Sequence, residues 1–313
     1  MPIYYCKMPD GNVGDDLNEA IWHHYFDFSK IPESEQIIGI GSLLNHFIPE
    51  AKRYTVISSG VGYGTPPSLT DDWNIIAVRG KHSATTLGLT EHNDIVLLDG
   101  AYLLQDCYPL PQLTPSNQIG YIPHVASIDL GNWQEVCDKA DVRFIDPRLP
   151  LDEFLTELSQ CEKVICEAMH GAILADMMQV PWKPVKAYAH INTTKWDDWL
   201  SVFDKKAQFT RIQGVWGEHK LNGVTRFKNT IKKLIFAFIE AKNITQPIYN
   251  KSSENDILKT VEQLKVVKDE RFYLNDQAQI HAKVSALKAA LSKLDYYKQQ
   301  NVKVHCNQPE VAS

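Results

Sequence analysis

The stretch VICEAMHGAILADMM, residues 164–178, places a histidine and a glycine between an apolar run and a helical pattern. KVICEA is typical of a buried strand that ends at Glu167, and GAILADMM is typical of a helix with Gly171 in its first turn. The free amides and positive dipole end of such a helix favour an anion, for which Gly171 leaves room. His170 could donate to that anion or transfer a proton near neutral pH. The alternative is a histidine that only caps the strand.

A second joint of this kind lies in AVRGKHSATTLGL, residues 77–89. Arg79 stands at the predicted strand end, and a helix is expected to begin near Ser83. Arg79 and His82 would then lie beside the first amides of that helix, an arrangement that suits a phosphate or a carboxylate. The alternative is a surface ion pair.

Acidic residues follow two glycines in GNVGDDLN, residues 11–18. Asp15 and Asp16 stand at a predicted helix start, where they could simply cap the helix and favour its dipole. The glycines would also let the backbone approach a ligand closely. Asp15 is therefore a candidate base or acceptor for a hydroxyl group.

Further polar residues stand close to predicted strand ends, where open α/β sheets bind ligands. Those that we add as candidates are Asn18, His124, Glu167 and Arg148. Arg148 would supply another cation, and its alternative role is an ion pair with Asp146 or Asp152.

The elements that must position these residues are short apolar runs alternating with helices. The runs are IYYC, QIIGIG, YTVISSG, NIIAVRG, DIVLLDG, IGYIPHV, VRFIDP and KVICEA. Continuous apolar strands separated by helices favour parallel sheets that are covered on both faces. The Pro-rich stretch 107–118 is typical of an interdomain linker. We therefore predict an α/β protein with a Rossmann-like domain at 1–110, a second at 111–214 and a helical extension at 215–313.

The extension carries two further signals. Residues 225–243 predict a basic, apolar helix that could lie on an anionic membrane surface or pack into the core. Between 252 and 300 the pattern is helical, with Val284, Leu287, Leu291 and Leu294 on one face. This face would pack on the body or on a partner, so it suggests a homo-oligomer.

Bulk composition excludes several classes of protein. The 313-residue chain has a formal charge of −6, which argues against a general nucleic-acid binder. The start of the sequence shows no signal peptide, and no apolar stretch is long enough to span a membrane. Six scattered cysteines without a CxxC pair are typical of free thiols in a reducing compartment and predict no metal site. A cytoplasmic protein is expected.

Taken in order, the segments GNVGDDLN, IGIGSLL, ISSGVGYG, VRGKHSATTLGL, LLDGAYLL, PHV and CEAMHGAILAD resemble the polysaccharide pyruvyl transferase family. The resemblance covers about residues 3–190 and is closest to the exopolysaccharide branch. It implies two Rossmann-like domains facing a cleft, as in B-type glycosyltransferases.

The activity that the resemblance implies is transfer of pyruvate from phosphoenolpyruvate to two hydroxyls of a sugar. The product is a cyclic ketal, phosphate is released, and no cofactor is needed. The acceptor would be a lipid-linked oligosaccharide at the inner membrane face. The family's motifs fall on Gly14, Asp15, Arg79, Ser83, His170 and Gly171. Many members have Arg or Ser where this chain has Ala168.

From these residues we expect His170 and Asp15 to be catalytic. Residues expected to bind phosphoenolpyruvate are Arg79, Ser83, Gly171, Arg148 and His82. Residues expected near the acceptor sugar are Asp16, Asn18, His124 and Glu167. Two alternatives are a nucleotide-sugar glycosyltransferase of the same shape and a sugar-binding protein without activity. The missing DxD motif does not decide against a glycosyltransferase.

Overall fold

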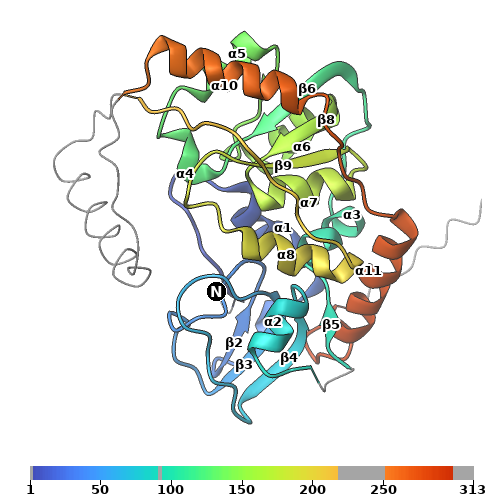
Figure 1. Ribbon diagram of the computed structural model, residues 1–313. Helices are drawn as coiled ribbons and strands as arrows, with labels where there is room; N and C mark the ends of the chain where they lie inside the picture. Colours follow the sequence, from blue (N-terminus) through green and yellow to red (C-terminus); the bar gives the residue numbers. More distant parts are fainter. Residues whose placement is uncertain (1–2, 91–93, 218–250, 299–313) are drawn as a thin grey trace, which may run out of the picture.

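Two parallel β-sheets, each with helices packed against it, form the body of the protein (Figure 1). The computed structural model describes residues 3–90, 94–217 and 251–298. Each sheet has five strands, and all recorded strand pairs are parallel. The predicted fold class, an α/β protein with two parallel sheets and C-terminal helices, is confirmed.

The first sheet follows chain order, β1-β2-β3-β4-β5. Its strands are β1 (Ile3–Tyr4), β2 (Glu35–Ile38), β3 (Arg53–Ser59), β4 (Trp73–Val78) and β5 (Val96–Leu97). The associated helices are α1 (Val13–Tyr25), α2 (Lys81–Thr86) and α3 (Leu104–Cys107). Because all strands run in one direction, their carboxyl ends lie along one edge of the sheet.

The second sheet has the order β10-β9-β8-β6-β7. Its strands are β6 (Ser116–Ile122), β7 (Arg143–Phe144), β8 (Cys161–Cys166), β9 (Trp182–Lys186) and β10 (Thr210–Arg211). The chain leaves β6 toward the edge strand β7 and then returns to β8 on the other side of β6. The connections therefore diverge between β6 and β8, where α/β sheets open a ligand-binding crevice.

Helices of the second half connect these strands, and two more follow in the C-terminal part. The connecting helices are α4 (Val125–Ile128), α5 (Trp133–Ala140), α6 (Leu151–Ser159), α7 (Met169–Met177) and α8 (Thr193–Leu200). The C-terminal helices are α10 (Glu254–Val267) and α11 (Gln277–Leu291).

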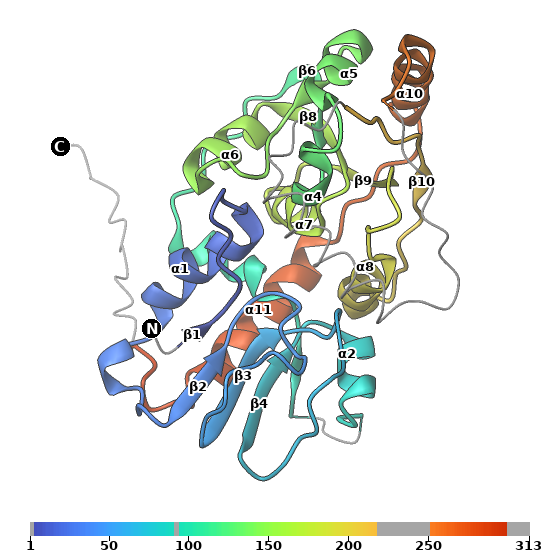
Figure 2. The same ribbon diagram turned by 90° about the vertical axis from the view of Figure 1, so that its left-hand side faces the viewer.

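The two C-terminal helices cover different halves of the molecule. α10 packs on α5 of the second half, whereas α11 crosses to β4 and β5 of the first (Figure 2). Val284, Leu287 and Leu291 are at most 3% exposed because the chain's own core covers them. This leucine-spaced face is therefore not a self-association surface, and it gives no support to the predicted homo-oligomer.

Asp176 ties the crossing segment to both halves. Its carboxylate accepts hydrogen bonds from the Tyr102 hydroxyl at 2.6 Å and the Trp182 indole at 2.9 Å. It also accepts from the Asn275 amide N–H at 2.8 Å and side chain at 2.9 Å. Four donors around one buried carboxylate compensate for its loss of water.

The domain boundaries proposed at 110 and 214 are not tested by these contacts and stay a prediction. The predicted amphipathic helix at 225–243 lies outside the described residues. Within residues 3–90, 94–217 and 251–298, no helix combines the length and apolar composition that a membrane span requires.

Helix α8 lies between the two halves (Figures 1 and 2). It follows β9 of the second sheet yet packs against α2 of the first half. Asp198 of α8 accepts a hydrogen bond from Arg79 Nε at 2.9 Å, and both side chains are fully buried. Its other oxygen accepts from the Ser83 amide at 2.9 Å. This buried pair fixes α8 against the end of β4.

We expect Asp198→Asn to lower the free energy of unfolding by about 3–5 kcal/mol, because it leaves the Arg79 charge buried without a counter-charge. Urea unfolding measures the change. The matched control is Asp204→Asn, which breaks the exposed Lys81–Asp204 pair between the same parts of the fold. That change should cost less than about 1 kcal/mol. Equal effects of the two substitutions would contradict the importance assigned to the buried pair.

Candidate functional site

A pocket of about 440 Å³ lies where the carboxyl ends of the two sheets meet. The first half contributes residues that follow β1, β2 and β3, together with the start of α1. The second half contributes the starts of α4, α7 and α8. Polar and charged residues in its wall are Asn12, Asp15, Ser42, Asn45, Tyr63, His124, Glu167, His170, Asn192 and Lys195. The pocket therefore includes the crevice between β6 and β8.

His170 is held between two elements of the first half. Its ring lies so close to Gly14 that a Cβ at that position would be 2.1 Å from Nδ1. The glycine that was expected to admit a ligand thus admits the His170 ring. On its other side, His170 Nε2 lies 3.8 Å from Asp99 Oδ2. Neither of these two buried atoms has a hydrogen-bond partner in the described part of the chain.

Asp99 is fully buried and supplies a negative charge beside His170. Its Oδ1 accepts a hydrogen bond from the Ala101 amide at 3.0 Å. Burial alone acts to raise the pKa of Asp99, but His170, the Ala101 amide and Arg79 together lower it below its ordinary value. A carboxylate that stays ionised here stabilises the protonated form of His170.

Asp15 lines the same pocket from the first turn of α1. Its Oδ2 accepts a hydrogen bond from Asn12 Nδ2 at 2.6 Å. Burial raises the pKa of Asp15, against the opposing effects of His170, Asn12 and Lys195. A carboxylate with a raised pKa beside a histidine is suited to accept a proton or to face a developing positive charge.

The first turn of α7 also faces the pocket, through Ala168, Met169, His170 and Gly171. In the described structure no acceptor is recorded for the amides of residues 169–171. The predicted anion-binding joint therefore has its donors available at the N-terminus of a nine-residue helix. A Cβ on Gly171 would lie 2.9 Å from Ile122, so the glycine also permits close packing of α7 on β6.

His124 and Glu167 meet at the ends of β6 and β8 and line the pocket. His124 Nδ1 accepts from the Ala126 amide at 3.1 Å, which leaves the ring proton on Nε2. Burial, Lys195 and His190 lower the pKa of His124 to about 3. Glu167 accepts from the amides of Ala187 at 2.9 Å and His124 at 3.3 Å, and burial raises its pKa.

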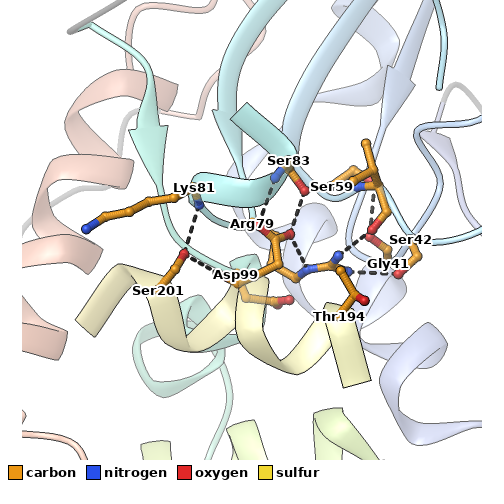
Figure 3. A network of polar contacts seen from close by, with 12 residues as sticks. Gly41, Ser42, Ser59, Arg79, Lys81, Ser83, Asp99, Thr194 and Ser201 are labelled. Carbon is orange, nitrogen blue, oxygen red and sulfur yellow. Dashed lines mark hydrogen bonds and ion pairs between the residues drawn. The ribbon is translucent and has the colours of Figure 1, made fainter. Parts of the chain in front are cut away.

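The predicted anion joint at Arg79 is filled by the chain's own Asp198 (Figure 3). Arg79 also donates to the Ser42 hydroxyl at 2.8 Å, and Ser83 donates to the Asp198 carboxylate. Neither Arg79 nor Ser83 lines the pocket, and His82 is exposed on α2. The local chemistry was predicted correctly, but the anion is intramolecular. A direct contact of these three residues with phosphoenolpyruvate stays a prediction.

Three other candidates lie outside the pocket wall. Arg148 forms ion pairs with Asp146 at 2.7 Å and Asp129 at 3.3 Å, and hydrogen bonding to Asp146 raises its pKa. Asn18 is buried and accepts from the Ile40 amide at 2.7 Å, which joins α1 to the end of β2. Asp16 lies on α1 without lining the pocket.

The sequence did not single out Lys195 and Asn192 of the pocket wall. Both belong to the start of α8, which follows a strand that the apolar runs did not reveal. Asn192 caps α8 and donates to the Gly62 carbonyl at 2.8 Å. An Asn before a helical pattern is a detectable cap signal, but only the fold shows that this helix reaches the pocket.

Metal chemistry is not indicated by the side chains that the structure describes. His, Cys, Asp and Glu residues there form no group of three that could hold a metal ion. The histidines, carboxylates and single ammonium group of the pocket are instead suited to acid–base chemistry on an anionic ligand.

Fold and pocket define a two-sheet α/β protein that binds an anion where the two carboxyl edges meet. Comparison with known families makes this more specific. The family model described as polysaccharide pyruvyl transferase matches residues 12–185, which include Asp15, Asp99, His124, Glu167 and His170. The chain belongs to this family.

A curated relative is similar over much of the chain. The succinoglycan biosynthesis protein ExoV of Rhizobium meliloti (strain 1021) is 35% identical over 206 residues. The aligned region covers 64% of this chain and 65% of the relative, so the chain spans just under two thirds of that protein's length. No solved structure matches the chain.

The low pKa of His124 predicts a pH dependence of stability. The folded chain keeps the ring neutral, so below the ordinary pKa of 6.5 the unfolded chain takes up a proton first. Stability should therefore fall from about pH 6.5 toward pH 3, by about 1 kcal/mol per pH unit from this residue. His124→Asn retains a cap acceptor and should flatten this slope in urea unfolding, whereas the exposed-residue variant His281→Asn should not. Parallel slopes for wild type and His124→Asn would contradict the burial effect.

Proposed function

We propose that the protein transfers the pyruvyl group of phosphoenolpyruvate to two hydroxyls of a sugar, forming a cyclic ketal and releasing phosphate. The observation that carries the proposal is the juxtaposition of His170 with Asp99 and Asp15 at a pocket with free helix amides. Family membership and the exopolysaccharide relative support pyruvyl transfer to a polysaccharide repeat unit. The acceptor in the proposal is a lipid-linked oligosaccharide.

The first chemical step adds one sugar hydroxyl to C2 of the donor while C3 gains a proton. His170 is the proposed acid, since the Asp99 carboxylate 3.8 Å away favours its protonated form. The electron pair of the C2–C3 double bond takes up this proton, and positive charge develops at C2. Asp15 faces that charge or accepts the proton of the attacking hydroxyl.

The second step breaks the bond between C2 and the phosphate oxygen, and the electron pair leaves with phosphate. The second hydroxyl then attacks C2 and closes the ketal, losing its proton. The free amides of residues 169–171 would bind an anionic end of the donor. His124 carries a proton on Nε2 and would donate to an acceptor oxygen, while Glu167 holds the His124 backbone in place.

We expect His170→Gln to lower kcat by about 10²- to 10⁴-fold with little change in donor affinity, because the variant cannot supply a proton. Phosphate release from phosphoenolpyruvate, measured with a panel of glycosides that carry 4,6- or 3,4-diols, tests this. His281→Ala, an exposed histidine on α11, is the control and should keep full activity. Near-normal turnover of His170→Gln would exclude His170 as the acid.

A thermal shift panel separates the proposed activity from glycosyl transfer. Phosphoenolpyruvate should raise the melting midpoint by mass action, and nucleotide sugars should not. A shift with nucleotide sugars alone would refute pyruvyl transfer and favour a glycosyltransferase.

The raised pKa of Asp15 predicts the acidic limb of the pH–rate profile. Burial favours the protonated form, so kcat/KM should fall with decreasing pH at a value above the ordinary 3.8 of an aspartate. Asp15→Asn should remove most of the activity and flatten that limb in what remains. Asp16→Asn, one position along α1 and outside the pocket wall, is the matched comparison and should retain the limb. An unchanged limb in Asp15→Asn would exclude Asp15 as its source.

A further inference from the structure

We propose that Lys195 binds the phosphate of the donor and stabilises it as it leaves. The inference rests on the proposed function and deepens it by assigning a residue to one end of the substrate. Phosphoenolpyruvate carries a phosphate and a carboxylate, so its pocket needs positive charge. Among the described residues that line the pocket, Lys195 is the only lysine or arginine.

The Lys195 ammonium group is not used by the fold. No carboxylate of the described residues forms an ion pair with it, and its Nζ lies 4.7 Å from the centre of the Tyr63 ring. Arg79 and Arg148, by contrast, are engaged with Asp198 and with Asp146. A cation that has only an aromatic face as its neighbour remains available to an anionic ligand.

Lys195 acts on the same space as the proposed catalytic residues. Its charge helps to lower the pKa of His124, and it opposes the burial effect on Asp15. It therefore lies within electrostatic reach of both sides of the pocket without contacting either carboxylate wall. A phosphate placed beside Lys195 would lie between the two halves of the molecule.

The position of Lys195 is set by two anchors on α8. Asn192 joins the start of the helix to the Gly62 carbonyl, and Asp198 joins its later turn to Arg79. Lys195 stands between these anchors. It also lies beyond residues 12–185, which the family model matches, so it is a feature of this chain's own sequence.

The chemistry of the two anionic ends assigns Lys195 to the phosphate. A lysine ammonium is a point charge that suits the non-planar phosphate dianion, whereas the amides of α7 supply several directed donors for a planar carboxylate. As the bond between C2 and oxygen breaks, charge accumulates on the leaving phosphate, and Lys195 stabilises it without giving up its proton.

The test compares Lys195→Met with Lys206→Met, which removes the same charge from an exposed site outside the pocket wall. Calorimetry of the full chain measures the affinity for phosphoenolpyruvate, and competition measures the affinity for inorganic phosphate. Lys195→Met should raise the dissociation constants for both about 10- to 100-fold, as expected for loss of a charged hydrogen bond. Lys195→Arg should recover part of the loss, and Lys206→Met should match the wild type.

The outcomes separate this inference from the proposed function. If the wild type binds phosphoenolpyruvate and Lys195→Met binds it equally well, Lys195 is not a donor ligand. If affinity for phosphoenolpyruvate falls but competition by inorganic phosphate is unchanged, the phosphate assignment is overturned in favour of the carboxylate. If the wild type does not bind phosphoenolpyruvate, the proposed function itself fails.

Discussion

The buried ion pair between Arg79 and Asp198 is the constraint on which the pocket depends. Both side chains are fully buried, so their lost hydration must be compensated within the fold. Hydrogen bonds from Arg79 to the Val61 carbonyl and the Ser42 hydroxyl, and from the Ser83 amide to Asp198, provide that compensation. The compensation exists only when α8 lies against the end of β4. A helix that follows the second sheet is thereby fixed on the first half and forms one wall of the pocket.

Charge in the pocket is divided between groups that the fold has already used and groups that remain available. Asp99 accepts from the Ala101 amide, and Glu167 accepts from two backbone amides. Asp15 has a single recorded donor to its carboxylate, the Asn12 side chain. The cationic side has the same division, because the arginines are paired and Lys195 is not. The available groups, Asp15, His170 and Lys195, are those that can respond to a ligand.

Local sequence patterns predicted most of the framework. Eight apolar runs correspond to β1–β8, because a buried parallel strand must be apolar along its whole length. The strand β9, WKPVK, contains two lysines and a proline, and β10 has two residues, so neither gave that signal. His170 and Asp15 were predicted to share a site because carboxyl ends of parallel strands lie along one edge. Lys195 was missed because its approach to the pocket depends on α8 packing on α2, a long-range contact.

The Arg79 joint shows why a correct chemical prediction can lead to the wrong ligand. An arginine before a helix start does bind an anion here, but the anion comes from a residue 119 positions away in the chain. Sequence spacing indicates which groups a joint offers and carries no information about what a distant helix brings to it. The α7 joint differs because the structure records no acceptor from the described residues for the amides of residues 169–171. Two joints of similar local sequence therefore divide the work: one holds the halves together, and the other remains open to a ligand.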